Sequence, residues 1–292
     1  MTPARRLRER LATGEPLLLP GAYNALAAKI LELAGHEAVY TGGYAAAAAN
    51  WGLPDIGLMT QTEMLGHINR VTGATSLPVV SDADTGFGDL INVARTVREY
   101  ERAGAAAIQF EDQVFPKKCG HMEGKKVIPT GEMVAKVRAA LAARTNPDTV
   151  IIARTDAIAV TGLDDAIDRM NAYADAGADI IFPDAPRSIE ELSEIRARVR
   201  PGAKLLANFS ENGKTPLLNV KEVGALGYTI ALYPSSLLFA AVKSAQEIAA
   251  LLKGEGTSAS AVSRMVGFDD LNDGILGKAA WQAEEERITA LG

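Results

Sequence analysis

Short apolar runs rich in β-branched residues recur along this 292-residue chain, and they alternate with longer segments whose apolar positions follow a helical period. The short runs predict buried strands of a parallel sheet, and the longer segments predict amphipathic helices between them. The predicted strands are Leu17–Leu19, Ala38–Thr41, Pro78–Ser81, Ala106–Phe110, Val150–Arg154, Asp179–Phe182, Lys204–Asn208 and Thr229–Tyr233. Eight strands alternating with helices predict an α/β fold of the (β/α)8 TIM-barrel type.

The helical segments between the strands support this repeat. Several of them end in Ala-Gly shortly before the next strand, as expected where glycine terminates a helix in the left-handed conformation. Clear examples of predicted helices are Val93–Ala103, Glu132–Ala143, Leu163–Ala176 and Ile189–Val199. Because no linker or low-complexity segment divides the chain, residues 1–292 are predicted to form a single barrel domain.

Helical segments continue past the eighth predicted strand, at Ser236–Lys253, Ala259–Val266 and Asp270–Leu291. One helix completes the last β/α unit, so the others are surplus to the barrel. Residues from about 236 to 292 are therefore predicted to pack on a partner subunit. At the other end, the charged N-terminal segment predicts a short surface helix.

Composition excludes several classes of function. The net charge of −6 and the absence of a basic patch argue against a nucleic-acid or membrane-surface partner. No apolar stretch is long enough to cross a bilayer, and the N-terminal segment lacks the apolar core of a signal peptide. Cys119 is the single cysteine, which excludes an internal disulfide and suits a reducing compartment. We therefore expect a cytoplasmic protein.

The segment Pro78–Gly88, PVVSDADTGFG, carries two carboxylates at the end of a predicted strand. Asp82 and Asp84 are two residues apart and so lie on one face of the strand. Converging carboxylate oxygens suit a hard divalent cation such as Mg²⁺. The alternative is a solvated turn with incidental acids, and the motif alone leaves both interpretations open.

Other polar residues occupy equivalent places, at or just past the carboxyl ends of the predicted strands, where barrel active sites are built. These residues are Asp82, Asp84, Glu111, Asp112, Arg154, Asp156, Asp184, Asn208 and Ser210. Their clustering favours a functional site. Asp112 and Asp156 are the members that we interpret as ordinary helix N-caps.

The segment Gln113–Lys126 follows the fourth predicted strand and is long, charged and glycine-containing, which indicates a mobile lid over the site. We call it the lid loop. Lys117, Lys118 and His121 surround Cys119 with positive charge, which favours a reactive thiol over an inert, packed cysteine. One cysteine and three histidines give no pair at the ligand spacing of a zinc site.

Together these motifs resemble the isocitrate lyase and phosphoenolpyruvate mutase superfamily, and within it the 2-methylisocitrate lyases. The resemblance covers about residues 20–257. It rests on Asp82–Gly88, Glu111–Gln113, Lys117–His121, Gly52–Gly57, Ile152–Ala157, Leu206–Asn208 and Gly213–Pro216.

The resemblance implies a homotetramer, a dimer of dimers that swap C-terminal helices. It also implies Mg²⁺, with Mn²⁺ as an alternative, bound by Asp82, Asp84, Glu111 and Asp55. Cys119 would be the catalytic acid.

Further implied roles concern the substrate. Arg154 would bind a substrate carboxylate, and Lys117 and His121 would shape the electrostatic field around Cys119. The remaining substrate-binding positions are Thr41, Gly42, Gly43, Lys118, Gly120, Asp184, Asn208, Ser210 and Thr215.

The implied reaction is cleavage of a carbon–carbon bond in a 2-hydroxy di- or tricarboxylate. The favoured case is 2-methylisocitrate, cleaved to pyruvate and succinate in propionate metabolism. Tyr40 is equally interpretable as the base for the hydroxyl proton or as a core aromatic residue. Alternative activities are those of a 2,3-dimethylmalate-type or oxaloacetate-acting lyase, or of a phosphonomutase that forms or rearranges carbon–phosphorus bonds.

Two departures from the family pattern bear on the substrate. Ungapped counting places Gly42 where a hydroxyl residue is usual and Tyr44 where a small residue is usual. Asp184 stands where methylisocitrate lyases typically carry glutamate. The shorter side chain of Asp184 retracts the carboxylate by one methylene. Both departures predict a remodelled pocket.

Overall fold

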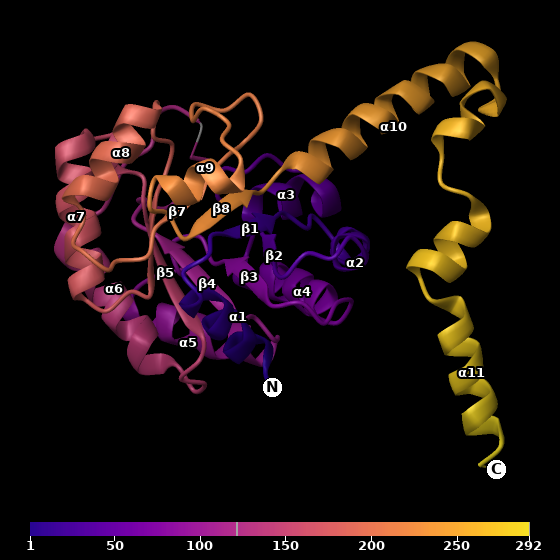
Figure 1. The fold of residues 1–292 in the computed structure, drawn as a ribbon, viewed down its shortest axis with the longest axis horizontal. Coiled ribbons are helices and arrows are strands. Elements are labelled where there is room, and N and C mark those ends of the chain that lie inside the picture. Colours follow the sequence, from indigo (N-terminus) through magenta and orange to yellow (C-terminus); the bar gives the residue numbers. More distant parts are fainter. Residues whose placement is uncertain (121, 292) are drawn as a thin grey trace. The chain divides into compact units, whose positions relative to one another are not determined.

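The computed structural model describes residues 1–120 and 122–291. The chain divides into two compact units, Met1–Leu238 and Phe239–Gly292, which we describe separately. The first unit is a β/α barrel (Figure 1). The helices between its strands surround a ring of parallel strands, and its N-terminal helix packs against the interior of that ring.

Eight parallel strands form this ring within the described residues. Five of them pair in the order β2-β3-β4-β5-β6 and three in the order β1-β8-β7. Single parallel bridges, Gly21 to Tyr40 and Ile181 to Leu205, link the two sheets at both edges. The strands are β1 (Leu17–Pro20), β2 (Val39–Thr41), β3 (Val79–Asp82), β4 (Ala107–Glu111), β5 (Val150–Thr155), β6 (Ile180–Pro183), β7 (Leu206–Asn208) and β8 (Ile230–Tyr233). The predicted barrel fold and its strands are confirmed.

Helices follow the strands, as predicted. Those of the first unit are α1 (Pro3–Ala12), α2 (Ala25–Leu33), α3 (Gly43–Ala46), α4 (Gln61–Thr72), α5 (Leu90–Arg102), α6 (Thr130–Ala143), α7 (Leu163–Asp175), α8 (Ile189–Arg198) and α9 (Val220–Ala225), with short turns η1 (Ala47–Trp51) and η2 (Ala157–Ala159). Two of the expected glycine ends, Gly104 (φ +89°) and Gly177 (φ +100°), adopt the left-handed conformation.

The strands bury both faces. Alternate residues such as Ile152 point into the barrel interior, whereas neighbours such as Ile151 pack against the surrounding helices. The interior cluster also contains Leu7 and Leu11 of α1, which are 1% and 5% exposed. The predicted short N-terminal helix is present, and the structure adds that it buries one apolar face against the barrel.

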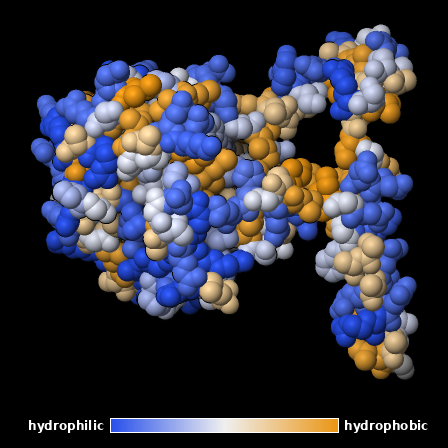
Figure 2. All heavy atoms as spheres, viewed as in Figure 1, coloured by the Kyte–Doolittle hydropathy of each residue, from blue (hydrophilic) through white to orange (hydrophobic). Residues whose placement is uncertain are grey.

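The second unit contains the rest of α10 (Ser236–Glu255), then η3 (Ala259–Arg264), η4 (Asp270–Ile275) and α11 (Lys278–Thr289). The single segment predicted over Asp270–Leu291 is thus two elements, because Gly277 at φ +69° breaks the helix. Figure 2 shows hydrophobic residues on the surface of this unit. Its exposed large side chains include Phe268 and Trp281, which are 80% and 75% exposed. Among the described residues, no helix combines the length and apolarity needed to span a membrane.

Candidate active site

The carboxyl ends of β3, β4, β5 and β6 bring the predicted site residues together. Strand register places Asp82 beside Gln109 and Glu111 beside Arg154. Asp184 follows β6 directly, and its backbone N–H donates to the carbonyl of Thr155 at 3.0 Å. All of these charged side chains are buried. The site therefore follows from strand register.

Asp82 is fixed by three hydrogen bonds. Its Oδ2 accepts from the backbone N–H of Gly43 at 3.0 Å, and its Oδ1 accepts from the N–H of Asp84 at 3.0 Å and from Nε2 of Gln109 at 3.3 Å. Hydrogen bonds of this kind stabilise an ionised carboxylate. The Asp82 side chain is therefore held in one orientation at the end of β3.

Lys117 of the lid loop joins the remaining acids of this cluster. Its Nζ lies 2.6 Å from Oδ1 of Asp55 and 2.7 Å from Oδ1 of Asp84, and its side chain is only 3% exposed. A Cβ added at Gly43 would meet the carboxylates of Asp82 and Asp84 and Nζ of Lys117, all within 3.4 Å. The loop thus places a cation directly against the carboxylates. We call Asp55, Asp82, Asp84 and Glu111 the carboxylate cluster.

The charge of the site is unbalanced. The described residues bring seven buried carboxylates to this end of the barrel, and four buried cations accompany them, Lys117, Lys125, Arg154 and Arg169. The seven carboxylates are Asp55, Asp82, Asp84, Glu111, Asp112, Asp156 and Asp184. Burial raises the pKa of Asp84 to about 7 despite the adjacent Lys117, and it raises the pKa of Glu111 well above its ordinary value. A further cation would relieve this excess.

The predicted Mg²⁺ ligands fit such a cation. Glu111 Oε1 is buried without a hydrogen-bond partner, and carboxylate oxygens are the ligands that Mg²⁺ prefers. Within residues 1–120 and 122–291, no three acidic, histidine or cysteine side chains already form a ligand set. In this arrangement the ammonium group of Lys117 lies between Asp55 and Asp84 and offsets only one of their negative charges.

Arg154 is oriented by a neighbouring acid. Its Nε and Nη2 donate to Asp156 at 2.8 and 2.9 Å, Nη2 lies 3.3 Å from Asp184 Oδ2, and Nε lies 3.4 Å from Glu111 Oε2. Its guanidinium also lies over the ring of Phe182, 5.1 Å from the centroid. These contacts hold the planar fork in one orientation, which is what recognition of a carboxylate requires.

The prediction that Asp112 and Asp156 are helix N-caps is wrong. Asp156 makes no capping hydrogen bond to η2, and although burial opposes its ionisation, Arg154 and Lys125 hold its pKa below the ordinary value. Asp112 accepts from Thr155 Oγ1 at 2.7 Å and from Tyr173 Oη at 2.8 Å. Both acids therefore hold neighbouring buried side chains of the site in place through hydrogen bonds.

Lys125, for which no role was predicted from the sequence, anchors the far end of the lid loop. Its buried Nζ contacts the carbonyl of Gly120, Oδ1 of Asp156 at 2.8 Å and Oδ2 of Asp184 at 3.5 Å. Gly120 packs so tightly that a Cβ there would overlap the Asp184 carboxylate. The N–H of Cys119 donates to the carbonyl of Asp55 at 3.0 Å. The loop thus lies against the site.

Tyr40, Thr41 and Gly42, at and just after the end of β2, contact other residues of the protein. Tyr40 is 4% exposed, its hydroxyl donates to Gln109 at 3.3 Å, and burial raises its pKa well above 10. Thr41 Oγ1 lies 2.6 Å from His67 Nε2, and Gly42 packs on the Tyr40 ring. These contacts favour the core interpretation of Tyr40 over the catalytic one.

The remaining predicted positions lie either on the lid loop or at and after the end of β7. Lys118 extends its Nζ to the carbonyl of Glu123 at 3.3 Å, on the loop itself, and His121 lies outside the described residues. Asn208 ends β7, with Thr215 and the half-buried Ser210 in the segment that follows. Asn208 Oδ1 and Thr215 Oγ1 are buried without hydrogen-bond partners. Such atoms are suited to a polar ligand.

The fold and site define a β/α-barrel enzyme with a carboxylate-rich centre at the carboxyl end of its strands. Residues 7–253 match the family described as phosphoenolpyruvate phosphomutase. The chain belongs to this family, and the predicted superfamily is confirmed.

Two curated relatives are similar over nearly the whole chain. 2,3-Dimethylmalate lyase of Eubacterium barkeri is 47% identical over 273 residues, which are 94% of this chain and 94% of the relative. 2-Methylisocitrate lyase of Salmonella typhimurium is 42% identical over 293 residues, covering 99% and 97% of the two chains. The predicted enzyme class, a carbon–carbon lyase, is confirmed by these relatives.

Two solved structures are also similar to this chain over nearly its whole length. A 2,3-dimethylmalate lyase, described as a member of the PEP mutase/isocitrate lyase superfamily, has a TM-score of 0.88 and 34% identity, covering 100% of this chain and 95% of that chain. Phosphonopyruvate hydrolase in complex with oxalate and Mg²⁺ also has a TM-score of 0.88, with 29% identity over 98% of this chain and 99% of that chain.

Proposed function

We propose that this protein is a Mg²⁺-dependent lyase that cleaves a 2-hydroxy di- or tricarboxylate, with 2-methylisocitrate as the favoured substrate and pyruvate and succinate as products. The observation that carries the proposal is the buried excess of carboxylates beside the oriented Arg154 and beneath the lid loop. The names of the two lyase relatives support the same reaction class.

Asp82 and Asp84 would hold Mg²⁺ directly or through water, with Glu111 and Asp55 completing the shell. When bound, the cation supplies electrophilic polarisation of the substrate's hydroxyl and carboxylate oxygens. Mn²⁺ accepts the same oxygen ligands. Lys117 would then shift its contacts among the acids of the carboxylate cluster.

The protein's own groups account for the remaining steps. Once the 2-hydroxyl has lost its proton to a carboxylate of the site, the C2–C3 bond breaks and C2 becomes the carbonyl carbon of a 2-oxo acid. The bonding electron pair stays on C3 and delocalises into the carboxylate attached to it. Arg154 stabilises that negative charge with its fork.

Cys119 completes the reaction by donating the proton of its thiol to C3. It lies on the lid loop, half-buried, with its backbone bonded to Asp55. Docking of the loop excludes water from the carbanion until this transfer. Tyr40 is not assigned as the base, because its hydroxyl is buried and bonded to Gln109.

A second candidate substrate is 2,3-dimethylmalate, which the same cleavage would convert to pyruvate and propionate. Burial and the charges of Cys119 and Asp55 raise the pKa of Tyr44, a bulky residue in the short helix α3. A bulky side chain there favours a substrate with a small substituent on C3, such as the methyl group of 2,3-dimethylmalate. The unpartnered Thr215 hydroxyl instead favours a distal carboxylate, as in 2-methylisocitrate.

Substitution of Asp184 or Tyr44 should change substrate preference more than stability. Asp184→Glu adds a methylene beside Gly120, and Tyr44→Gly opens space near Cys119, so each changes the pocket by a definite volume. We expect kcat/KM ratios between 2-methylisocitrate and 2,3-dimethylmalate to shift by about 10–200-fold. Melting temperatures provide the stability control. Unchanged ratios in both variants would show that neither residue borders the substrate.

Lys125→Met should loosen the lid loop. The substitution removes the cation between Asp156 and Asp184 and frees the Gly120 carbonyl, while leaving a side chain of similar length. We expect kcat/KM to fall by about 10–100-fold and proteolytic cleavage within the loop to accelerate, whereas Lys125→Arg retains most of both properties. Wild-type rates of turnover and proteolysis in Lys125→Met would contradict this anchoring role.

We also propose a homotetramer in which the second unit packs on another copy of the chain, as the resemblance implies. The second unit exposes several large apolar side chains, among them Phe268 and Trp281, which supports this proposal. Light scattering on the full chain after size exclusion measures the assembly directly.

A further inference from the structure

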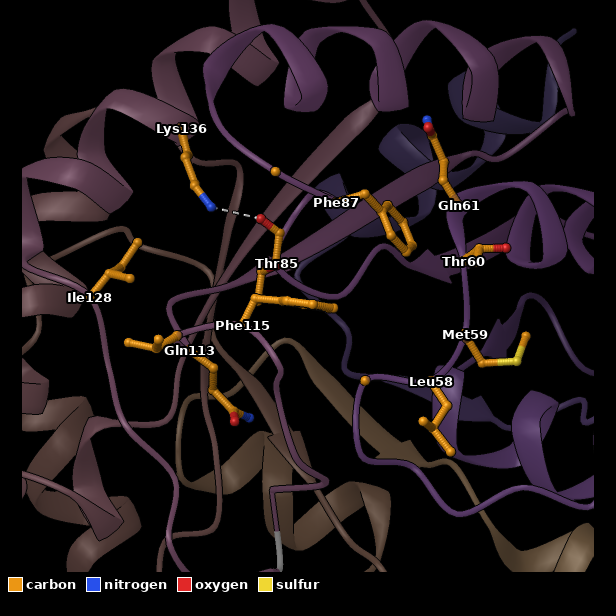
Figure 3. Close-up of a pocket in the computed structure, with 13 residues that line it drawn as sticks. Leu58, Met59, Thr60, Gln61, Thr85, Phe87, Gln113, Phe115, Ile128 and Lys136 are labelled. Carbon is orange, nitrogen blue, oxygen red and sulfur yellow. Dashed lines mark hydrogen bonds between the residues drawn. The ribbon is translucent and has the colours of Figure 1, made fainter.

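A cavity of about 490 Å³ lies beside the turn that follows β3 and the start of the lid loop. Figure 3 shows its walls, which are mainly apolar and include Leu58, Met59, Phe87, Phe115 and Ile128. This volume is within the range of small-molecule sites. None of the acids of the carboxylate cluster lines it.

Among the described residues that line this cavity, the charged one is Lys136 of α6. Lys136 is 9% exposed, and its Nζ donates to the carbonyl of Thr85 at 2.9 Å (Figure 3). In the described part of the chain, no carboxylate lies within 4.0 Å of this ammonium. Asp89 and Glu132 act on it only at longer range, and burial lowers the pKa of Lys136.

A buried cation without a counter-ion is costly, and its remaining hydrogen-bonding capacity is available to a ligand. An ammonium group has three donors, of which the Thr85 carbonyl uses one. A carboxylate could accept the other two and offset the buried charge. The apolar walls would then cover the rest of the molecule.

We propose that this cavity, the Lys136 cavity, binds an organic monocarboxylate with an apolar body. The carboxylate would lie on Nζ of Lys136, with the aliphatic or aromatic part against Phe87, Phe115 and Leu58. Di- and tricarboxylates are disfavoured here, because their additional charges would meet apolar walls without a second cation. The ligand class thus differs from the substrate class of the carboxylate-rich site.

Isothermal titration of the full chain with hexanoate and with benzoate at pH 7.5 tests the proposal. Wild-type protein should bind one molecule per chain in a saturable manner. Lys136→Met, which keeps the length of the side chain without its charge, should weaken binding by about tenfold or more, whereas Lys136→Arg should stay within about threefold of wild type.

Melting temperatures of both variants provide the folding control, and an excess of succinate provides the competition control. Absence of saturable binding would overturn the proposal. Equal affinity in Lys136→Met would also overturn it, because binding would then not involve the ammonium group. Displacement of hexanoate by succinate would place binding at Arg154 and overturn it as well.

Discussion

Replacing Cys119 with serine is expected to lower kcat by about 10²–10⁴-fold while KM stays close to the wild-type value. A serine hydroxyl is a far weaker acid than a thiol, so protonation of C3 becomes slow, yet the two side chains are nearly equal in size. The backbone contact of residue 119 with Asp55 does not depend on the side chain. Steady-state kinetics with the preferred 2-hydroxy acid measures both constants.

Met122→Leu, three residues further along the same loop, is the matched control. It conserves volume and apolar character and should leave kcat within a few-fold of wild type. Near-normal turnover in Cys119→Ser would make Cys119 a packing residue. It would also favour a group-transfer reaction, in which no carbanion has to be protonated.

Removal of divalent cations is expected to abolish turnover, and added Mg²⁺ should restore it. Without the metal, the carboxylate cluster retains an excess of buried negative charge that Lys117 alone cannot neutralise. Mg²⁺ should also raise the melting temperature of the wild-type protein, because a ligand that binds only the folded state stabilises it. Asp84→Asn should lose both the activation and the thermal shift.

Asp175→Asn is the control for this experiment, because Asp175 forms an exposed ion pair with Arg200 away from the site. It should keep the activation and the thermal shift. A chelated, metal-free preparation with full activity would refute the role assigned to the carboxylate cluster.

Strand positions were predictable because burial on both faces of a parallel barrel leaves an unbroken apolar run such as that of β5, which no surface element shows. The site followed from the same logic, since Asp82 and Glu111 come directly after such runs. The pairing of Arg154 with Asp156 was not predicted, because Asp156 lies past the end of β5, where the backbone turns into η2 and strand alternation no longer applies.

Other features depend on contacts between segments distant in sequence. Lys125 meets Asp156 and Asp184 only because the lid loop returns to the barrel, and no local pattern encodes that return. The burial of α1 against the barrel interior depends equally on tertiary packing, because its charged composition alone resembles that of a surface helix. Local periodicity therefore predicts which segments form helices and strands better than it predicts which other segments pack against them.

The most direct test of the proposed function is a product assay with the wild-type protein and Mg²⁺. 2-Methylisocitrate, 2,3-dimethylmalate, isocitrate and phosphoenolpyruvate are supplied separately, and the products are identified by NMR. We predict equal amounts of pyruvate and succinate from 2-methylisocitrate, with pyruvate and propionate from 2,3-dimethylmalate as the result that favours the second candidate. Conversion of phosphoenolpyruvate to a phosphonate, with no carbon–carbon cleavage of any hydroxy acid, would contradict the assignment as a lyase.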